Sequence, residues 1–156
     1  MRLHRFAVLS LVLALLGGAA AQDAYAGIRS GYPLGATLHY GTAIGPAADA
    51  RFSVRVTSDG GAVRAGVGVD VLSPFVVDGP VTGYYGAGPA IEIGGDRAVL
   101  DVHGLVGGEY RFAAANLPQL GLFLEGSLGA RIGLGVSDAS TQLPALGAAL
   151  GVNWHF

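Results

Sequence analysis

The sequence predicts an all-β protein, an eight-stranded antiparallel up-and-down β-barrel. Three observations support this prediction. First, apolar residues recur at every second position through most of the chain after residue 21, and this period places successive side chains on opposite faces of a strand. Second, clusters of Gly, Pro, Asp and Asn divide the alternating sequence into eight segments. Third, none of these segments shows the apolar spacing of an amphipathic helix.

The first 21 residues have the composition of an export signal peptide. Arg2 and Arg5 give a positive start, and an apolar stretch from Phe6 to Leu16 follows. Small residues then form an Ala-x-Ala site, which we expect to be cut after Ala21. A second such site would be cut after Ala26 and would remove part of the first strand. An uncleaved anchor fits less well, because the apolar stretch is short for a spanning helix.

The remaining chain, residues 22–156, has the size of one domain. The whole sequence is 51% hydrophobic and only 13% charged, with 27 glycines and neither cysteine nor lysine. The absence of cysteine excludes disulfide bonds and thiolate metal sites. Residues 22–156 contain seven Arg against eleven Asp and Glu, and this acidic balance argues against a nucleic-acid-binding protein.

Turn residues set the boundaries of the expected strands. Ser58–Gly61 and Gly94–Arg97 have the composition of tight hairpin turns, and Ser73–Pro80 is the longest expected connection. Connections on the side of the chain termini (43–49, 73–80, 113–118) are expected to be as long as those on the opposite side (31–33, 58–61, 94–97, 135–142), or longer. The expected strands are residues 23–30, 34–42, 50–57, 62–72, 81–93, 98–112, 119–134 and 143–156.

Turn residues and alternation define the first four segments. Residues 23–30 and 34–42 end at Gly-Tyr-Pro and Gly-Pro clusters, which break strands. In 50–57, one Phe and two Val alternate with two Arg, Ser and Thr. In 62–72, four Val and one Ala alternate with Arg, Asp and Gly. Each of the latter two segments therefore has one apolar face without charges.

The later segments follow the same rule. In 81–93, Tyr, Ala, Pro and Ile alternate with Thr, Tyr, Gly and Glu. In 98–112, both acids, the His and the Arg share one face, and in 119–134 a face of six Leu or Ile opposes Glu and Arg. In the last segment, apolar residues occupy every second position from Leu146 to Phe156.

The polar face is expected to line the barrel interior, and the apolar face to contact lipid. The polar face is rich in Gly, lacks Lys, and carries nearly equal numbers of positive and negative groups, which suits a narrow interior where charges must pair. Only a closed barrel satisfies the backbone of strands in lipid. The sequence thus predicts a transmembrane barrel with a charge network in its lumen, formed by Arg29, Arg51, Arg55, Arg64, Asp70, Glu92, Asp101, His103, Glu109, Arg111, Glu125 and Arg131.

The C-terminal strand, which ends on an apolar aromatic residue, resembles that of small eight-stranded bacterial outer-membrane β-barrels, the outer membrane protein beta-barrel domain type. Residues 103–112 and 120–129 are similar in composition to a late hairpin of such proteins. The resemblance covers residues 22–156 and implies Sec-type export to the bacterial outer membrane, with both termini in the periplasm. It implies that the barrel assembly machinery recognises the last strand through an assembly signal formed by Leu150, Val152, Trp154 and Phe156.

A membrane barrel of this kind also has expected partners and expected positions for its aromatic residues. Outer-membrane lipids and, during biogenesis, periplasmic chaperones are the expected partners, and a closed barrel without free edges can be a monomer. Aromatic residues on the lipid face are expected to form a girdle at the periplasmic interface. The aromatic residues expected toward that side are Tyr25, Tyr40, Phe52, Tyr84, Tyr85, Tyr110, Phe112, Phe123, Trp154 and Phe156.

The expected function is structural, in support of envelope integrity, without catalysis, cofactor or metal. Eight strands leave an interior that side chains can fill, so an open channel is not expected. Three alternatives remain open: a narrow pore for ions or small solutes, a lipid-modifying enzyme, and a soluble periplasmic barrel that binds a ligand. The enzyme would use Ser127 as nucleophile and His103 as base. The soluble barrel would have its apolar side chains inside.

Overall fold

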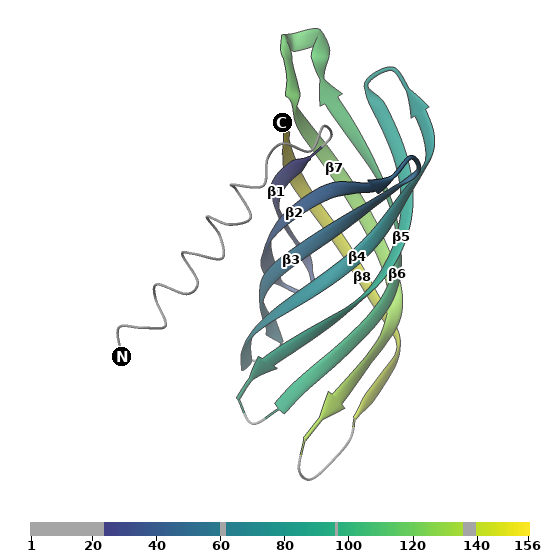
Figure 1. The fold of residues 1–156 in the computed structure, drawn as a ribbon. Helices are drawn as coiled ribbons and strands as arrows, with labels where there is room; N and C mark the ends of the chain where they lie inside the picture. The colour runs from purple at the N-terminus through teal and green to yellow at the C-terminus, as the bar shows by residue number, and fades with distance from the viewer. Residues whose placement is uncertain (1–23, 60–61, 96, 136–139) are drawn as a thin grey trace.

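The computed structural model describes residues 24–59, 62–95, 97–135 and 140–156, which form a closed barrel of eight antiparallel strands (Figure 1). Each strand pairs with its neighbours in sequence, and β1 closes the barrel against β8. The all-β, up-and-down fold is thereby confirmed. The strands are β1 (Tyr25–Tyr32), β2 (Gly35–Gly45), β3 (Ala48–Asp59), β4 (Ala62–Asp78), β5 (Val81–Gly94), β6 (Arg97–Phe112), β7 (Leu117–Leu134) and β8 (Thr141–His155).

The predicted signal peptide, residues 1–21, and the expected cut after Ala21 lie outside the described residues. The alternative cut after Ala26 falls within β1. It would remove Tyr25 and Ala26, which pair with β2 on one side and with β8 on the other. Loss of these pairs would shorten the strand that closes the barrel.

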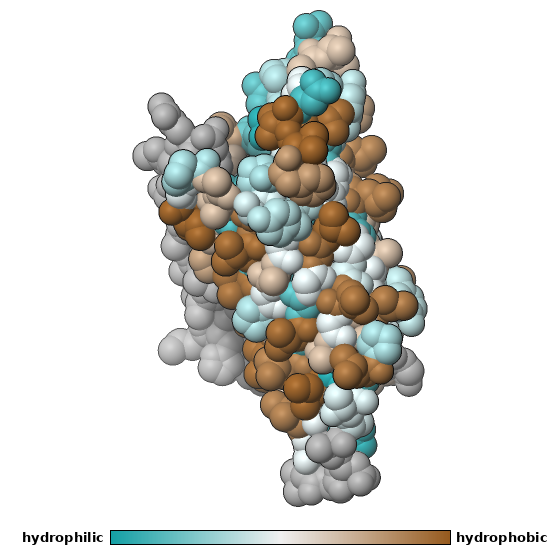
Figure 2. Space-filling model, turned by 90° about the vertical axis from the view of Figure 1, so that its right-hand side faces the viewer, coloured by the Kyte–Doolittle hydropathy of each residue, from teal (hydrophilic) through white to brown (hydrophobic). Residues whose placement is uncertain are grey.

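Side chains alternate between an apolar outer surface and a polar interior. Leu38 and Leu124 are 60% and 62% exposed on the outside, whereas Arg51, Asp70 and Glu92 are 1–2% exposed inside. Figure 2 shows apolar side chains over much of the outer face on the right of Figure 1. This arrangement confirms the predicted orientation of the faces, and it is the reverse of a soluble barrel, which buries its apolar side chains.

The prediction of a long connection at residues 73–80 is wrong. β4 continues to Asp78, and its pairing with β5 extends to the end of the strand through a β-bulge between Pro74 and Val76. The remaining turn is tight and contains Gly79 at φ 56°, a left-handed conformation that favours glycine. The bulge accommodates the proline, so the sequence signal for a loop marks an irregular strand instead.

The two other connections near the termini are also shorter than expected. β2 ends at Gly45 and β3 begins at Ala48. β6 and β7 are joined by a single 3₁₀ turn, η1 (Ala113–Ala115), followed by Asn116 in the left-handed conformation. Among the described residues, no helix is long and apolar enough to cross a membrane.

The barrel wall is uneven in height. β1, β2 and β3 contain 8, 11 and 12 residues, whereas β5, β6 and β7 contain 14, 16 and 18. We call the end that holds Ala24 and Phe156 the inner end and the opposite end the outer end. In Figure 1 the β4–β5 and β6–β7 hairpins extend beyond the other strands at the inner end, and β7 and β8 reach furthest at the outer end.

Candidate functional site

The centre of the lumen contains an ion-pair cluster built from four strands. Arg51 on β3 and Asp70 on β4 are directly opposite in register, so their side chains share the inner face. The Nε and Nη2 atoms of Arg51 donate to Oδ2 of Asp70 at 3.2 and 3.0 Å. Nη1 of Arg51 donates across the barrel to Glu125 on β7, which also accepts from Arg29 on β1. The cluster therefore links both sides of the barrel.

Two buried aromatic side chains share the lumen with this cluster: Tyr84 bonds to it, and Phe123 packs edge-on against His39. The Tyr84 hydroxyl donates to Oε1 of Glu125 at 2.8 Å, and Phe123 is 1% exposed. Gly107 provides space for Tyr84, because a Cβ atom there would lie 2.7 Å from the ring. Together, ion pairs and rings fill the lumen at this level.

A second group of charges lies toward the outer end. Glu92 accepts hydrogen bonds from Thr57 Oγ1 at 2.8 Å and from Arg131 Nη2 at 3.0 Å. Nη1 of Arg55 lies 3.4 Å from Glu92 and 3.9 Å from Asp101. Arg131 and Asp101 are opposite in register on β7 and β6, with their charged atoms 3.7 Å apart. Every charge in this group has an opposite charge beside it.

Arg64 lies half-buried near the outer rim. With Arg131, Ser140 and Gln142 it lines a small cavity of about 150 Å³. This residue stands apart from the central cluster, although the sequence places it on the same strand face as Asp70.

His103 connects the central and outer charge groups. Its Nδ1 atom lies 2.9 Å from Asp101 Oδ1, and its Nε2 atom lies 3.2 Å from Asp70 Oδ1. Both ring nitrogens are therefore engaged by carboxylates. Neither is left to accept a proton from Ser127, which a Ser–His nucleophile would require. The geometry of the lumen thus does not provide the pair that the enzyme alternative needs.

A third polar group lies at the inner end. Asn153 Nδ2 donates to Glu109 Oε2 at 2.6 Å, and Asn153 Oδ1 lies 2.7 Å from Nε2 of His39. Glu109 also contacts His155, whose other ring nitrogen lies 3.0 Å from Arg111 Nη2. The Arg111 side chain is 47% exposed, so it belongs to the rim rather than to the packed interior.

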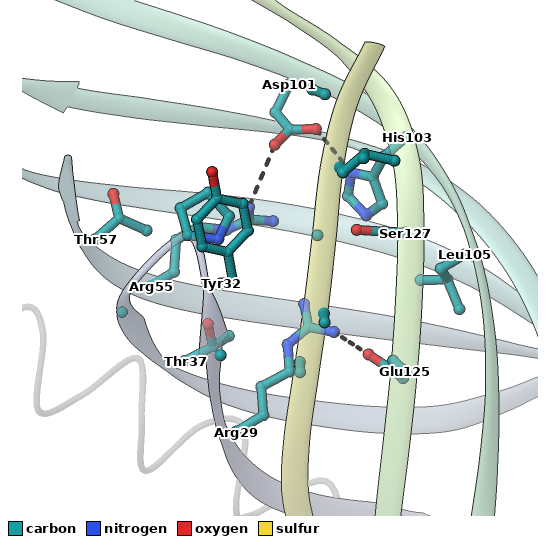
Figure 3. Close-up of a pocket in the computed structure, with 18 of the residues that line it drawn as sticks. Arg29, Tyr32, Thr37, Arg55, Thr57, Asp101, His103, Leu105, Glu125 and Ser127 are labelled. Atoms are coloured by element: carbon teal, nitrogen blue, oxygen red, sulfur yellow. Dashed lines mark hydrogen bonds and ion pairs between the residues drawn. The ribbon is translucent and has the colours of Figure 1, made fainter.

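An open cavity of about 110 Å³ occupies the outer half of the lumen. Figure 3 shows Arg55 facing Asp101 and Arg29 facing Glu125 across this region. Such a volume holds several water molecules. At its inner side the cavity ends at the charge network of the lumen.

The residues proposed as an assembly signal lie on the outer surface of β8. Leu150, Val152, Trp154 and Phe156 are all exposed, in contrast to Asn153, which points inward. The backbone N–H of Phe156 donates to the carbonyl of Ala24 at 2.9 Å. The chain end is thus fixed to the beginning of β1.

Sequence alternation placed the charged residues on one face, but it did not identify all their partners. Tyr84, Thr57, Asn153 and His39 complete the network as uncharged or ambivalent groups. Tyr84 and Thr57 have the same parity as the charged residues of β5 and β3, and that was the available signal for them. β2 and β8 contain no Arg, Asp or Glu, so for His39 and Asn153 the signal was only their alternation with apolar neighbours. Among the described residues, no group of three His, Asp or Glu side chains is placed to hold a metal ion.

The chain is similar to known proteins in structure but not in sequence. No protein-family model matches the sequence, and no curated protein matches it. Among solved structures, the chain is similar to the crystal structure of Neisserial surface protein A, with 18% sequence identity and a TM-score of 0.49. The match covers 86% of this chain and 94% of that one.

Proposed function

We propose that this protein is an integral bacterial outer-membrane β-barrel with a structural role in the cell envelope and a lumen closed to ions. The observation that carries the proposal is the contrast between an apolar outer surface and a charge-paired interior. Contact between water and such an apolar outer surface would be unfavourable. Large exposed apolar patches therefore mark surfaces that contact lipid or another protein. In lipid, the closed barrel satisfies the backbone along the middle of every strand.

Closure of the lumen is supported by packing at its centre. Arg51, Glu125 and Phe123 are between 1% and 4% exposed, although they face the barrel axis. A continuous water path would leave these side chains accessible. These buried side chains support a packed layer, rather than a channel, at the inner side of the outer cavity.

Conductance in planar bilayers tests this closure. The refolded protein is expected to give no discrete current steps, whereas the double variant Arg51→Ala/Glu125→Ala should conduct because it lacks the central cation and its acceptor. Arg97→Ala, at the exposed first residue of β6, serves as a matched control and should remain silent. Ion-selective steps from the unmodified barrel would establish the narrow-pore alternative instead.

We also propose that the barrel is not a lipid-modifying enzyme. This proposal is supported by His103, whose two ring nitrogens face Asp101 and Asp70. Incubation of the refolded protein with phospholipid or lipid A is expected to release no acyl chains. Release that disappears in His103→Ala would contradict the proposal.

Membrane location has its own test. In outer-membrane fractions the protein should migrate differently on gels before and after boiling, as closed barrels do when they resist detergent. Recovery in the soluble periplasmic fraction without detergent would refute the membrane proposal.

A further inference from the structure

The barrel presents two walls of different height to its surroundings. We call β1, β2 and β3 the short wall and β5, β6 and β7 the tall wall. A strand tilted as in membrane barrels gains about 2.4 Å of height per residue. The 11 residues of β2 then span about 26 Å, and the 18 residues of β7 span about 43 Å.

Two strand edges without a second neighbour border the short wall. At the outer end, β1 stops at Tyr32, which pairs with Ala148, so β8 from Thr141 to Gly147 pairs only with β7 among the described strands. At the inner end, the last partner of β3 on β4 is Leu72, so Ser73–Asp78 pairs only with β5. We call these segments the outer edge and the inner edge.

Unpaired edges cannot lie in hydrocarbon, because backbone N–H and C=O groups there have no water to bond with. Both edges are partly adapted to a polar setting. Pro144 in the outer edge has no N–H group, and the Ser73 hydroxyl donates to the carbonyl of Ala47 at 2.9 Å. The hydrocarbon layer beside the short wall must therefore lie between the outer edge and the inner edge. This limits its thickness there to the height of β2.

The tall wall requires a thicker hydrocarbon layer than the short wall. Its outer face remains apolar along its length, with Leu134 and Val102 exposed toward the outer end and Leu122 and Leu117 exposed toward the inner end. Figure 2 shows apolar side chains at many heights on the side of the barrel that includes β4 to β6. A bilayer that covers this face fully would be thicker than one that fits the short wall.

We propose that the barrel holds the bilayer at two thicknesses, with short or disordered lipid chains packed against β1–β3 and longer, extended chains against β5–β7. The partner of the short wall is thus lipid acyl chain, in a locally thinned membrane. This inference rests on the proposed membrane location. Thinning is the established response of a bilayer to a hydrophobic surface shorter than its core.

Single-tryptophan fluorescence can test the inference, because Trp154 is the only tryptophan in the sequence. In a Trp154→Phe background, one Trp is placed at each end of each wall. The short-wall reporters are Leu34→Trp and Ile44→Trp, and the tall-wall reporters are Leu134→Trp and Leu117→Trp; all four positions are exposed. Each variant is reconstituted in phosphatidylcholines from dimyristoyl to dierucoyl and checked for folding by its heat-dependent gel migration.

As the bilayer thickens, the tall-wall reporters are expected to enter hydrocarbon and shift their emission to the blue by several nanometres. The short-wall reporters are expected to keep the emission of the membrane interface throughout, because the adjacent edges hold the bilayer thin. Equal blue shifts for both sets would overturn the inference.

Brominated lipids separate failure of the inference from failure of the membrane proposal. Leu38→Trp reports on the middle of the short wall and Leu124→Trp on the middle of the tall wall. Quenching of both supports lipid contact on both walls. Quenching of Leu124→Trp alone would show that protein, such as a second copy, covers the short wall, and would overturn the inference. If neither is quenched, the membrane location itself is wrong.

Discussion

At the scale of single residues, the lumen depends on charges that are buried and paired. Arg51 is the central residue of this network, because it pairs with Asp70 on the neighbouring strand and with Glu125 across the barrel. A buried ion pair adds little net stability, because desolvation offsets the attraction. Removing one partner is different, because it leaves the other charge buried without compensation.

Arg51→Ala is therefore expected to destabilise the folded barrel by about 3–5 kcal/mol, the range for breaking a buried pair. The free energy of unfolding, measured by urea titration in lipid vesicles, checks this. Arg97→Ala, at the exposed first residue of β6, should change the free energy of unfolding by less than about 0.5 kcal/mol. An Arg51→Ala barrel as stable as the parent would show that water hydrates the cluster.

Glycines in the lumen provide a second residue-scale prediction. Gly107→Ala would place a Cβ atom 2.7 Å from the Tyr84 ring, and the strain is expected to cost about 1–3 kcal/mol. Gly126→Ala is a suitable control, because a Cβ there would have no atom within 4 Å. Urea titration of both variants compares them directly. Equal stability would mean that Tyr84 moves freely in the lumen.

At the scale of elements, the sequence predicted strands more reliably than their ends. Alternation revealed β4, but Ser73 and Pro74 read as the start of a loop. The strand continues because a bulge restores its pairing with β5, and pairing across strands leaves no local signal. The charge network shows the same limit. Register makes Arg51 and Asp70 neighbours, whereas the contact from Arg51 to Glu125 crosses the barrel and depends on its diameter.

The last strand provides the element-scale prediction. Deletion of Phe156 removes an exposed aromatic side chain and the hydrogen bond to Ala24, while the interior stays unchanged. It is expected to lower the amount of folded protein in the outer membrane several-fold, measured by fractionation and gel migration. Leu143→Ala, at an exposed position at the far end of β8, should assemble normally. Normal levels of the truncated protein would argue against an assembly signal in this strand.

At the scale of the whole molecule, closure separates this barrel from a curled sheet. The seam between β1 and β8 is formed by eight residue pairs, from Tyr25↔His155 to Tyr32↔Ala148. It joins the shortest strand, of 8 residues, to a strand of 15 residues, so part of β8 extends past the end of β1. The same mismatch creates the outer edge of β8.

Amide hydrogen exchange of the refolded barrel in detergent tests closure directly. Residues 25–31 of β1 and 148–154 of β8 pair on two sides, so their amides should exchange slowly, like those in the middle of β6. In contrast, alternate amides of Thr141–Gly147 and Ser73–Asp78 face away from their single partner strand and should exchange quickly. Pro144 contributes no amide to this comparison. Fast exchange along the whole of β1, with slow exchange retained in β6, would mean that the barrel opens at its seam in solution.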